Sequence, residues 1–264
     1  MTAPTSNPSS NPPASRVLLT GASSGIGAAL AVELAKRGHQ LWLGARRADK
    51  LAELVATITA ADGTATAVTL DVSDHLACAA TVARLDDDCG GFDIVIANAG
   101  VGGKQTSIWK ITADDAKDVL DTNFTGALAT ILPLLPKMRA RGRGQVVGMS
   151  SIAADVALPM APVYGSSKAG FTFFLDSIAT ELAAANIAVT IVHPGFVRTP
   201  MTDAQKYPMP FMVEVDVAAK TIADAIEKRA SWLRFPLGLR AIAGAANMLP
   251  RAVRVALIRK SAKR

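Results

Sequence analysis

Short apolar runs alternate with longer stretches of helical periodicity from Arg16 onward, and this alternation constrains the fold more than any other feature. In stretches such as 25–37 and 50–61, apolar residues recur at three- and four-residue steps, as in amphipathic helices. The runs are apolar throughout, which predicts strands that are buried on both faces of a parallel sheet. They lie at 17–19, 41–43, 67–70, 94–96, 145–148 and 189–192, and a last strand is expected at 231–235. The sequence therefore predicts an α/β fold: a single doubly wound Rossmann domain whose mostly parallel sheet has about seven strands and helices on both faces.

Three segments are expected along the 264 residues. Residues 1–15 are rich in Pro, Ser and Asn and are expected to form a disordered tail. Residues 16–235 are expected to form the Rossmann domain, with a substrate loop at about 195–214. Residues 236–264 are expected to be a basic, apolar helical extension of that domain. Half of the chain is apolar and 19% is charged, which is sufficient for a large core.

The net charge of +6 is concentrated at one end of the chain. Residues 231–264 contain eight Lys or Arg and no Asp or Glu, so the remainder carries −2. Nucleic acid is therefore not expected as a partner. The helix expected at about 251–260 alternates apolar and basic residues. Such helices can lie on anionic membrane surfaces, which makes peripheral membrane contact one interpretation. A cap over the substrate pocket or a subunit interface is the other. No run approaches the roughly 18 apolar residues of a spanning helix.

Cysteine and histidine usage gives no sign of a metal centre. Cys78 and Cys89 lie apart from any Cys-x-x-Cys or Cys/His cluster, so neither a disulfide framework nor a zinc site is expected. This usage is typical of a reducing compartment and favours a cytoplasmic location, with membrane association left open by the basic end. His39, His75 and His193 are interpreted as structural residues.

The first expected strand leads directly into a glycine-rich loop, and a helix follows. The loop reads Thr20-Gly21-Ala22-Ser23-Ser24-Gly25-Ile26-Gly27. Its glycines allow a tight turn and a close approach of the backbone to a ligand, with free N–H groups at the helix start. A pyrophosphate placed there gains hydrogen bonds and a favourable interaction with the helix dipole. The loop therefore predicts a dinucleotide site.

The end of the second strand distinguishes the two nicotinamide dinucleotides. An NAD site usually has Asp or Glu about 20 residues past the first glycine, to bind the ribose 2′-hydroxyl. Here the segment reads Gly44-Ala45-Arg46-Arg47, without an acidic residue. Two guanidinium groups suit a 2′-phosphate, which favours NADP(H) over NAD(H), with a solvated basic loop as the alternative.

Tyr164 and Lys168 are four residues apart and are expected on one face of a helix. A phenol with a pKa of about 10 is a poor base at neutral pH. A nearby ammonium group favours the phenolate, which makes proton exchange with an alcohol or ketone practical. Ser150 and Ser151 end the strand that begins near Gln145, at the sheet edge where doubly wound proteins bind ligands.

Together these motifs resemble those of the short-chain dehydrogenase/reductase family, and the resemblance extends from Arg16 to about Arg229. Besides the glycine loop, Ser151, Tyr164 and Lys168, the matching elements are Asp71-Val72, Asn98-Ala99-Gly100, Asn123 in Asn123-Phe124-Thr125-Gly126, and Pro194-Gly195-Phe196-Val197-Arg198-Thr199. One departure is Ala97, which stands where the family often has a second asparagine.

The resemblance implies a role for each of these residues. Ser151 would bind the substrate oxygen, Tyr164 would exchange its proton, Lys168 would hold the ribose and bias Tyr164, and Asn123 would anchor a relay water. The implied cofactor-binding residues are Thr20, Gly21, Ser23, Ser24, Gly25, Ile26, Gly27, Arg46, Arg47, Asp71, Val72, Asn98, Ala99, Gly100, Tyr164, Lys168, Pro194, Gly195, Val197 and Thr199. The implied activity is interconversion of a ketone or aldehyde and its alcohol with NADP(H), and no metal is required.

Apolar residues dominate the two segments expected to face the substrate. These residues are Val156, Ala157, Leu158, Pro159 and Met160 in the first segment, and Phe196, Met201, Tyr207, Met209, Phe211 and Met212 in the second. A lipophilic small molecule is one interpretation, and a lid packed on the body or a subunit interface is the other. A homo-oligomer, dimer or tetramer, is expected. The C-terminal region departs from the Gly-Gly-rich tail with which many family members seal a tetramer.

Two other functions compete with the oxidoreductase. Gly21-x-Ser23-x-Gly25 also matches a nucleophile elbow, for which His193 and Asp155 could supply the base and the acid of a serine hydrolase. That interpretation leaves Tyr164 and Lys168 unexplained. A non-catalytic NADP-binding regulator on the same fold is the second alternative.

Overall fold

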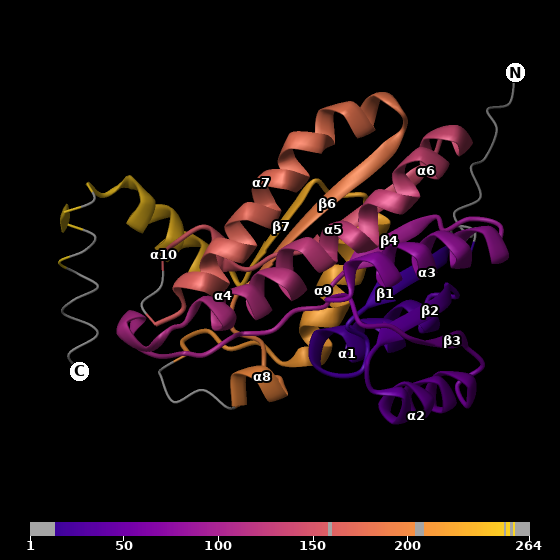
Figure 1. Cartoon of the computed structure of the whole chain (residues 1–264), viewed down its shortest axis with the longest axis horizontal. Coiled ribbons are helices and arrows are strands. Elements are labelled where there is room, and N and C mark those ends of the chain that lie inside the picture. The colour runs from indigo at the N-terminus through magenta and orange to yellow at the C-terminus, as the bar shows by residue number, and fades with distance from the viewer. Residues whose placement is uncertain (1–13, 158–159, 204–208, 251, 254–255, 257–264) are drawn as a thin grey trace, which may run out of the picture.

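The computed structural model describes residues 14–157, 160–203, 209–250, 252, 253 and 256 (Figure 1). Its strands form one seven-stranded parallel sheet in the order β3-β2-β1-β4-β5-β6-β7. They are β1 (Arg16–Thr20), β2 (Gln40–Ala45), β3 (Thr64–Thr69), β4 (Ile94–Ala97), β5 (Gly144–Met149), β6 (Ile187–Pro194) and β7 (Trp232–Phe235). The prediction of a doubly wound α/β fold is confirmed.

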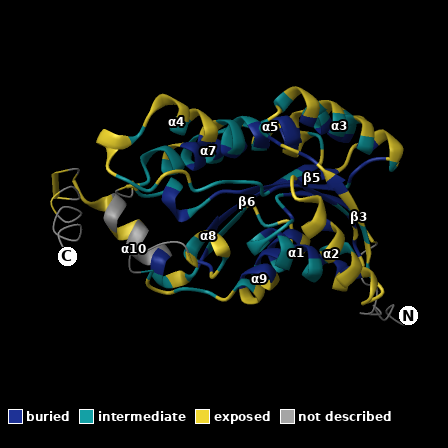
Figure 2. Cartoon of the chain, turned by 60° about the horizontal axis from the view of Figure 1, so that its bottom comes forward, coloured by how far each residue is buried: buried dark blue, intermediate teal, exposed yellow. Residues whose placement is uncertain are grey.

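Helices cover both faces of the sheet (Figures 1 and 2). On one face lie α1 (Gly25–Lys36), α2 (Ala48–Thr59) and α9 (Val215–Glu227), and on the other α3 (His75–Asp88), α5 (Gly126–Ile131) and α7 (Pro162–Ala184). The others are α4 (Ala113–Leu120), α6 (Leu135–Arg141), α8 (Pro200–Asp203), α10 (Leu237–Met248), the 3₁₀ turns η1 (Ile108–Lys110), η3 (Leu132–Leu134) and η4 (Ile152–Ala154), and the π-helical η2 (Asp121–Thr125).

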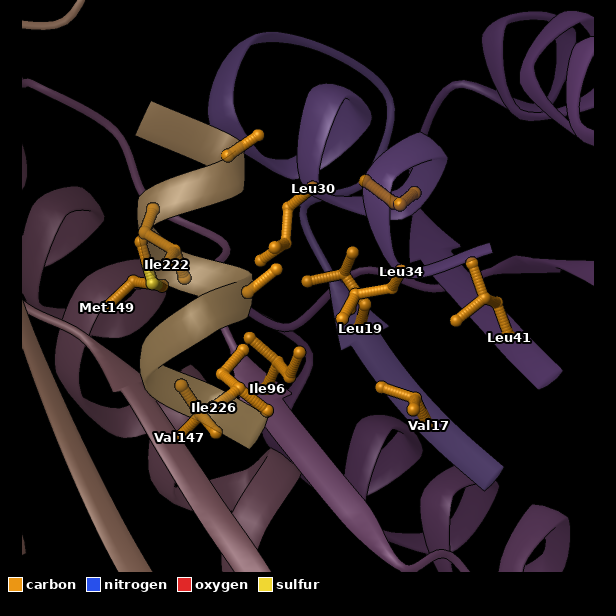
Figure 3. Close-up of a cluster of buried hydrophobic side chains, with 14 of the residues drawn as sticks. Val17, Leu19, Leu30, Leu34, Leu41, Ile96, Val147, Met149, Ile222 and Ile226 are labelled. Carbon is orange, nitrogen blue, oxygen red and sulfur yellow. The ribbon is translucent and has the colours of Figure 1, made fainter. Parts of the chain in front are cut away.

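Two apolar clusters form the core, one on each face of the sheet. In the first, Leu30 of α1 and Ile222 of α9 pack over Leu19, Ile96 and other strand residues (Figure 3). This arrangement explains why the central strands read as continuous apolar runs, since each is buried from both sides.

Strand β3 begins at Thr64, earlier than the predicted run at 67–70. It lies at the sheet edge, and the side chains of Thr64, Thr66 and Ala67 are exposed while Val68 is buried. An edge strand needs no continuous apolar run, so the apolar pattern identified only the end of it.

The described residues include only part of each end of the chain. Residues 1–13 of the predicted tail, and most of the basic helix predicted at 251–260, lie outside the described residues. The part of the extension that is described forms α10, which packs against β7 and η4. Among the described helices, none combines the length and the apolar character needed to cross a membrane.

The winding of the sheet defines where a ligand can bind. The chain runs outward from β1 through β2 to β3 and then crosses back to β4 on the other side of β1, so the direction of winding reverses between β1 and β4. The loops after these strands diverge and leave a crevice at the carboxyl ends, which is where open α/β sheets bind their ligands.

Candidate active site

A cleft of about 420 Å³ lies at this carboxyl edge. It is lined by loops that follow the six strands from β1 to β6, and by the first turns of α7. Every residue predicted to bind the cofactor lines it except Thr20, and so do three of the four predicted catalytic residues, Ser151, Tyr164 and Lys168. The structure therefore gathers into one site residues that lie up to 178 positions apart, from Gly21 to Thr199.

The glycine loop fits closely against the loop after β4. Gly21 has φ +70°, and a Cβ there would lie 2.6 Å from the Cα of Ala99. A Cβ on Gly27 would lie 2.3 Å from the carbonyl oxygen of Gly21. Since both obstructions are backbone atoms, neither position accepts a side chain. Because these glycines carry no side chain, the loop packs closely against the loop after β4, and a ligand can reach the start of α1.

Hydrogen bonds between Thr20, Gly21 and Asn98 hold this loop in place. The Nδ2 of Asn98 donates to the carbonyl oxygens of Thr20 (2.9 Å) and Gly21 (3.1 Å), and the backbone N–H of Asn98 donates to Thr20 Oγ1 at 3.2 Å. Thr20 is buried and lies outside the cleft lining. Thr20 therefore supports the loop through its hydrogen bonds with Asn98 and does not itself face the cleft.

The N-terminus of α1 is open toward the cleft. Ser24 is its N-cap but makes no side-chain capping hydrogen bond, and the first turn contains no acidic residue. The Ser24 hydroxyl instead accepts a hydrogen bond from Arg47 (2.8 Å). The partial positive charge of the helix end is therefore not neutralised by a side chain, which suits an anionic ligand.

Two arginines lie at the end of the cleft beyond β2. Arg47 donates to Ser23 Oγ at 2.9 Å, while Arg46 is two-thirds exposed and lies 3.9 Å from a carboxylate oxygen of Asp71. Hydrogen bonds from Ser73, together with the charge of Arg46, hold the pKa of Asp71 below its usual value. This end of the cleft thus presents guanidinium groups and two serine hydroxyls.

Lys168 lies at the opposite end, one turn after Tyr164 on α7. Its Nζ donates to the carbonyl oxygen of Met149 at the end of β5 (2.8 Å). The side chain is almost completely buried, and burial lowers the pKa of Lys168 to about 8. An ammonium group at this depth acts through a medium of low dielectric constant, so its influence on Tyr164 is larger than it would be in water.

Ser151 follows β5 directly and begins the turn η4. Its Oγ accepts a hydrogen bond from the backbone N–H of Ala153 (3.1 Å). Among the described residues no acceptor is recorded for the Ser151 O–H itself, which leaves that proton for a ligand in the cleft.

Asn123 lies behind the cleft lining and is fully buried. It belongs to η2, whose π-helical turn between α4 and α5 is of a kind frequent at functional sites. Its Oδ1 accepts from Val101 N–H (2.7 Å), and its Nδ2 donates to the Val101 carbonyl (2.9 Å) and to Ser167 Oγ (3.1 Å). In the structure its amide holds the loop after β4 against α7. Its role as the anchor of a relay water stays a prediction.

The structure brings His193 and Asp155 together, with Nδ1 and Oδ2 3.1 Å apart. However, the other ring nitrogen of His193 lies 3.3 Å from Thr172 Oγ1, whereas Ser23 is hydrogen-bonded to Arg47. No Ser-His-Asp arrangement around Ser23 is therefore assembled, and the hydrolase interpretation loses its geometric basis.

Two further lining residues were singled out in other roles, Ser150 at the end of a strand and Met201 in the substrate-facing segment. The sequence did not single out several residues that also line the cleft: Ala45, Leu70, Val101, Thr122, Met149, Pro200 and Thr202. Of these, Thr202 supports the loop after β6, since its Oγ1 donates to the carbonyl of Val197 (2.7 Å) and accepts from the N–H of Thr199 (2.9 Å). The available signal was Thr199-Pro200, a typical helix start.

Apolar residues gather beside Ser151. Ile152 of η4 and Leu239 of α10 are buried against each other, with Val156 and Phe196 packed on them. A Cβ on Gly238 would lie 2.8 Å from the ring of Phe211, so α10 also meets the loop after β6. Residues 158–159 and 204–208, which include Tyr207, lie outside the described residues.

Known proteins resemble this chain in sequence over most of its length. The sequence model of the family described as short chain dehydrogenase matches residues 15–209. An uncharacterized oxidoreductase of Myxococcus xanthus is 37% identical over 233 residues, which cover 88% of this chain and 92% of the relative.

Two solved structures share the fold. A short-chain dehydrogenase from Sphingobium yanoikuyae in complex with NADPH has a TM-score of 0.79 and 28% identity, with 92% of this chain and 95% of the other covered. A short-chain dehydrogenase/reductase from Burkholderia phymatum in complex with NAD has a TM-score of 0.81 and 22% identity, with 89% and 93% covered.

Proposed function

The chain belongs to the short-chain dehydrogenase/reductase family of oxidoreductases, and we propose that it interconverts a lipophilic ketone or aldehyde and the corresponding alcohol with NADP(H). The observation that carries this proposal is that a single cleft contains residues suited to each part of the reaction. Ser151, Tyr164 and Lys168 line one end of it, while the glycine loop, Arg46 and Arg47 line the other. A dinucleotide is the kind of ligand that spans both ends.

The residues present fit NADP(H). The bare glycine loop and the open end of α1 suit the pyrophosphate, and Arg46 and Arg47 suit the 2′-phosphate. Asp71 and Val72 would lie beside the adenine. Asn98 to Gly100 and the loop from Pro194 to Thr199 would border the nicotinamide half. When bound, NADP(H) supplies or accepts the hydride.

The protein's own contribution is to bind the substrate oxygen and to move one proton. The O–H of Ser151 donates to that oxygen and positions the carbonyl carbon. Tyr164 then gives its phenolic proton to the oxygen during reduction, or removes it during oxidation. Lys168, one turn away and buried, stabilises the phenolate through its charge. The orientation of these groups lowers the barrier.

The preference for NADP(H) is tested by Arg46→Ala. Arg46 is exposed and its ion pair with Asp71 is long, so the protein loses little when the side chain is removed. A charge-assisted hydrogen bond to the 2′-phosphate is worth enough that NADPH should bind about tenfold to a hundredfold more weakly, while NADH changes by less than about threefold. Titration of protein fluorescence with each cofactor measures both constants.

The matched control is Arg84→Ala. Arg84 is an equally exposed arginine paired with Asp88 on α3, away from the cleft. It should leave both dissociation constants unchanged. Equal weakening of NADPH and NADH in Arg46→Ala would mean that Arg46 does not touch the 2′-phosphate.

The lipophilic substrate is supported by the apolar surroundings of Ser151 and by Met201 in the cleft lining. Each buried methylene contributes about 0.8 kcal/mol, so kcat/KM for a series of methyl ketones should rise about fourfold per added methylene until the site is filled. Steady-state rates along such a series measure this. A flat or falling series would contradict the lipophilic class while leaving the reaction type intact.

The assembly and location proposals follow from the surface. Leu132 after α5 and Phe173 of α7 expose apolar side chains, 46% and 76% accessible, which supports a homo-oligomer. We propose a cytoplasmic location and peripheral membrane contact through residues 251–260, and binding of the purified chain to anionic vesicles tests that contact. Light scattering of the purified chain measures the oligomeric state.

A further inference from the structure

A hydrogen-bonded network of polar side chains runs beneath the active site, from β7 to α7. The carboxylate of Asp155 is its centre, and Asp155 follows directly after η4, the turn that Ser151 begins. Its Oδ2 lies 3.1 Å from Nδ1 of His193 on β6 and accepts from Nε of Arg234 on β7 at 3.0 Å. Its Oδ1 accepts from Nη2 of Arg234 at 3.4 Å. The turn is thus attached to two neighbouring strands.

The network continues through the ring of His193, which is completely buried. Its Nε2 lies 3.3 Å from the Thr172 hydroxyl on α7, and Thr172 Oγ1 lies 2.7 Å from Ser150 Oγ. Ser150 Oγ in turn donates to the carbonyl of Lys168 at 3.2 Å. The segment carrying Ser151 is therefore held at both ends, by Ser150 to the helix of Tyr164 and Lys168 and by Asp155 to β6 and β7.

Aromatic contacts support the charged groups of this hydrogen-bonded network. Arg234 stacks on the ring of Trp232, with the guanidinium carbon 4.1 Å from the ring centroid, and that ring lies 5.1 Å from the ring of His193. Burial raises the pKa of Asp155, but the hydrogen bonds and charges of His193 and Arg234 outweigh it, so the net shift is downward. Asp155 is therefore an ionised anchor near neutral pH.

We propose that Asp155, held by His193 and Arg234, is a positioning residue that sets the distance between the Ser151 hydroxyl and Tyr164. This inference rests on the proposed function, because it assigns Asp155 to the same reaction. Among the described residues that line the cleft, none is Asp155, His193 or Arg234, so the effect on a substrate passes through the Ser151 turn. Displacement of a catalytic group by about 1 Å can cost on the order of a hundredfold in rate.

The test is Asp155→Asn, which keeps the size of the side chain but removes its charge. We expect kcat to fall about tenfold to a hundredfold, with little change in KM or in the dissociation constant of NADPH, because the glycine loop and the arginines are not touched. The same substitution introduced into Ser151→Ala should cause no further loss of kcat, because the group that Asp155 positions is already absent.

Two further variants separate positioning from stability. Asp86→Asn removes an equally paired carboxylate, 2% exposed and 2.9 Å from Arg141, at the C-terminal end of α3. It should lower the melting temperature without changing kcat. Should Asp155→Asn fail to fold, Arg234→Lys is the alternative, because it removes the two-point contact of the guanidinium group with the Asp155 carboxylate. Arg234→Lys should lower kcat when introduced alone and should cause no further loss of kcat in Ser151→Ala.

The outcomes are distinct. A wild-type enzyme that turns over with NADPH, combined with full kcat in Asp155→Asn, would overturn the positioning role alone. The same holds if the losses in Asp155→Asn and Ser151→Ala simply multiply in the double variant, because a structural role acts on both backgrounds equally. A wild-type chain that binds NADPH but reduces no carbonyl compound would overturn the proposed function, and this inference with it.

Discussion

Tyr164→Phe is expected to lower the turnover number by about 10²- to 10⁴-fold, the usual contribution of a general acid or base. The substitution removes only the phenolic oxygen, and the ring that lines the cleft remains. The dissociation constant of NADPH should therefore stay within about twofold of the wild-type value. Single-turnover rates at saturating NADPH, combined with fluorescence titration of the cofactor, separate the two effects.

Ser177→Ala is the matched control for this loss of a hydroxyl. Ser177 lies on the same helix, is exposed, and donates to the carbonyl of Phe173. It should retain full turnover. A Tyr164→Phe enzyme with more than about a tenth of the wild-type rate would show that another group transfers the proton.

Lys168→Met is expected to abolish turnover and at the same time to stabilise the protein in the absence of cofactor. The pKa of Lys168 is about 8 in the folded chain and 10.5 as the reference value, so burying the ammonium costs roughly 3 kcal/mol at neutral pH. Loss of the hydrogen bond to Met149 costs about 1 kcal/mol. The free energy of unfolding at pH 7 should therefore rise by roughly 2 kcal/mol, a trade of stability for activity.

The difference in unfolding free energy between Lys168→Met and the wild type should depend on pH in a defined direction. Below pH 8 the lysine is protonated in both states, so the wild-type protein carries the full cost and the difference from Lys168→Met is greatest. Between about pH 8 and 10.5 the unfolded chain binds more protons than the folded chain, so wild-type stability rises with pH and the difference shrinks. Urea unfolding across this range measures it, with the exposed Lys110→Met as control. A variant less stable than wild type at pH 7 would contradict the assignment.

The sheet and the glycine loop could be predicted because their signals are local. Central strands such as β1 and β4 are buried on both faces and therefore read as apolar runs, whereas the exposed start of β3 does not. The positions of Gly21 and Gly27 follow from backbone contacts that no side chain can share. Sequence alone could therefore place the glycine loop and the strands to within one or two residues of their C-terminal ends.

Contacts between distant segments were beyond prediction from sequence. Asp155 meets His193 across 38 positions, a pairing that the sequence offered only for a hydrolase at Ser23, and it meets Arg234 across 79 positions, a spacing that carries no periodic signal. Similarly, nothing in the sequence separates Asn123, which holds the backbone of Val101, from a residue that points into the cleft. Only the packing of η2 and η4 against their neighbours decides which side chains reach a ligand.

The most direct test of the central claim is to follow the hydride itself. The purified enzyme is given NADPH deuterated at the transferable position of nicotinamide C4, together with aliphatic and cyclic ketones and aldehydes of increasing apolar size, and the alcohols are analysed by mass spectrometry. We expect one deuterium at the carbinol carbon for each NADPH consumed, a slower reaction with NADH, and none with Tyr164→Phe on the same timescale. NADPH that binds but delivers no deuterium to any of these compounds would contradict the assignment as a carbonyl reductase.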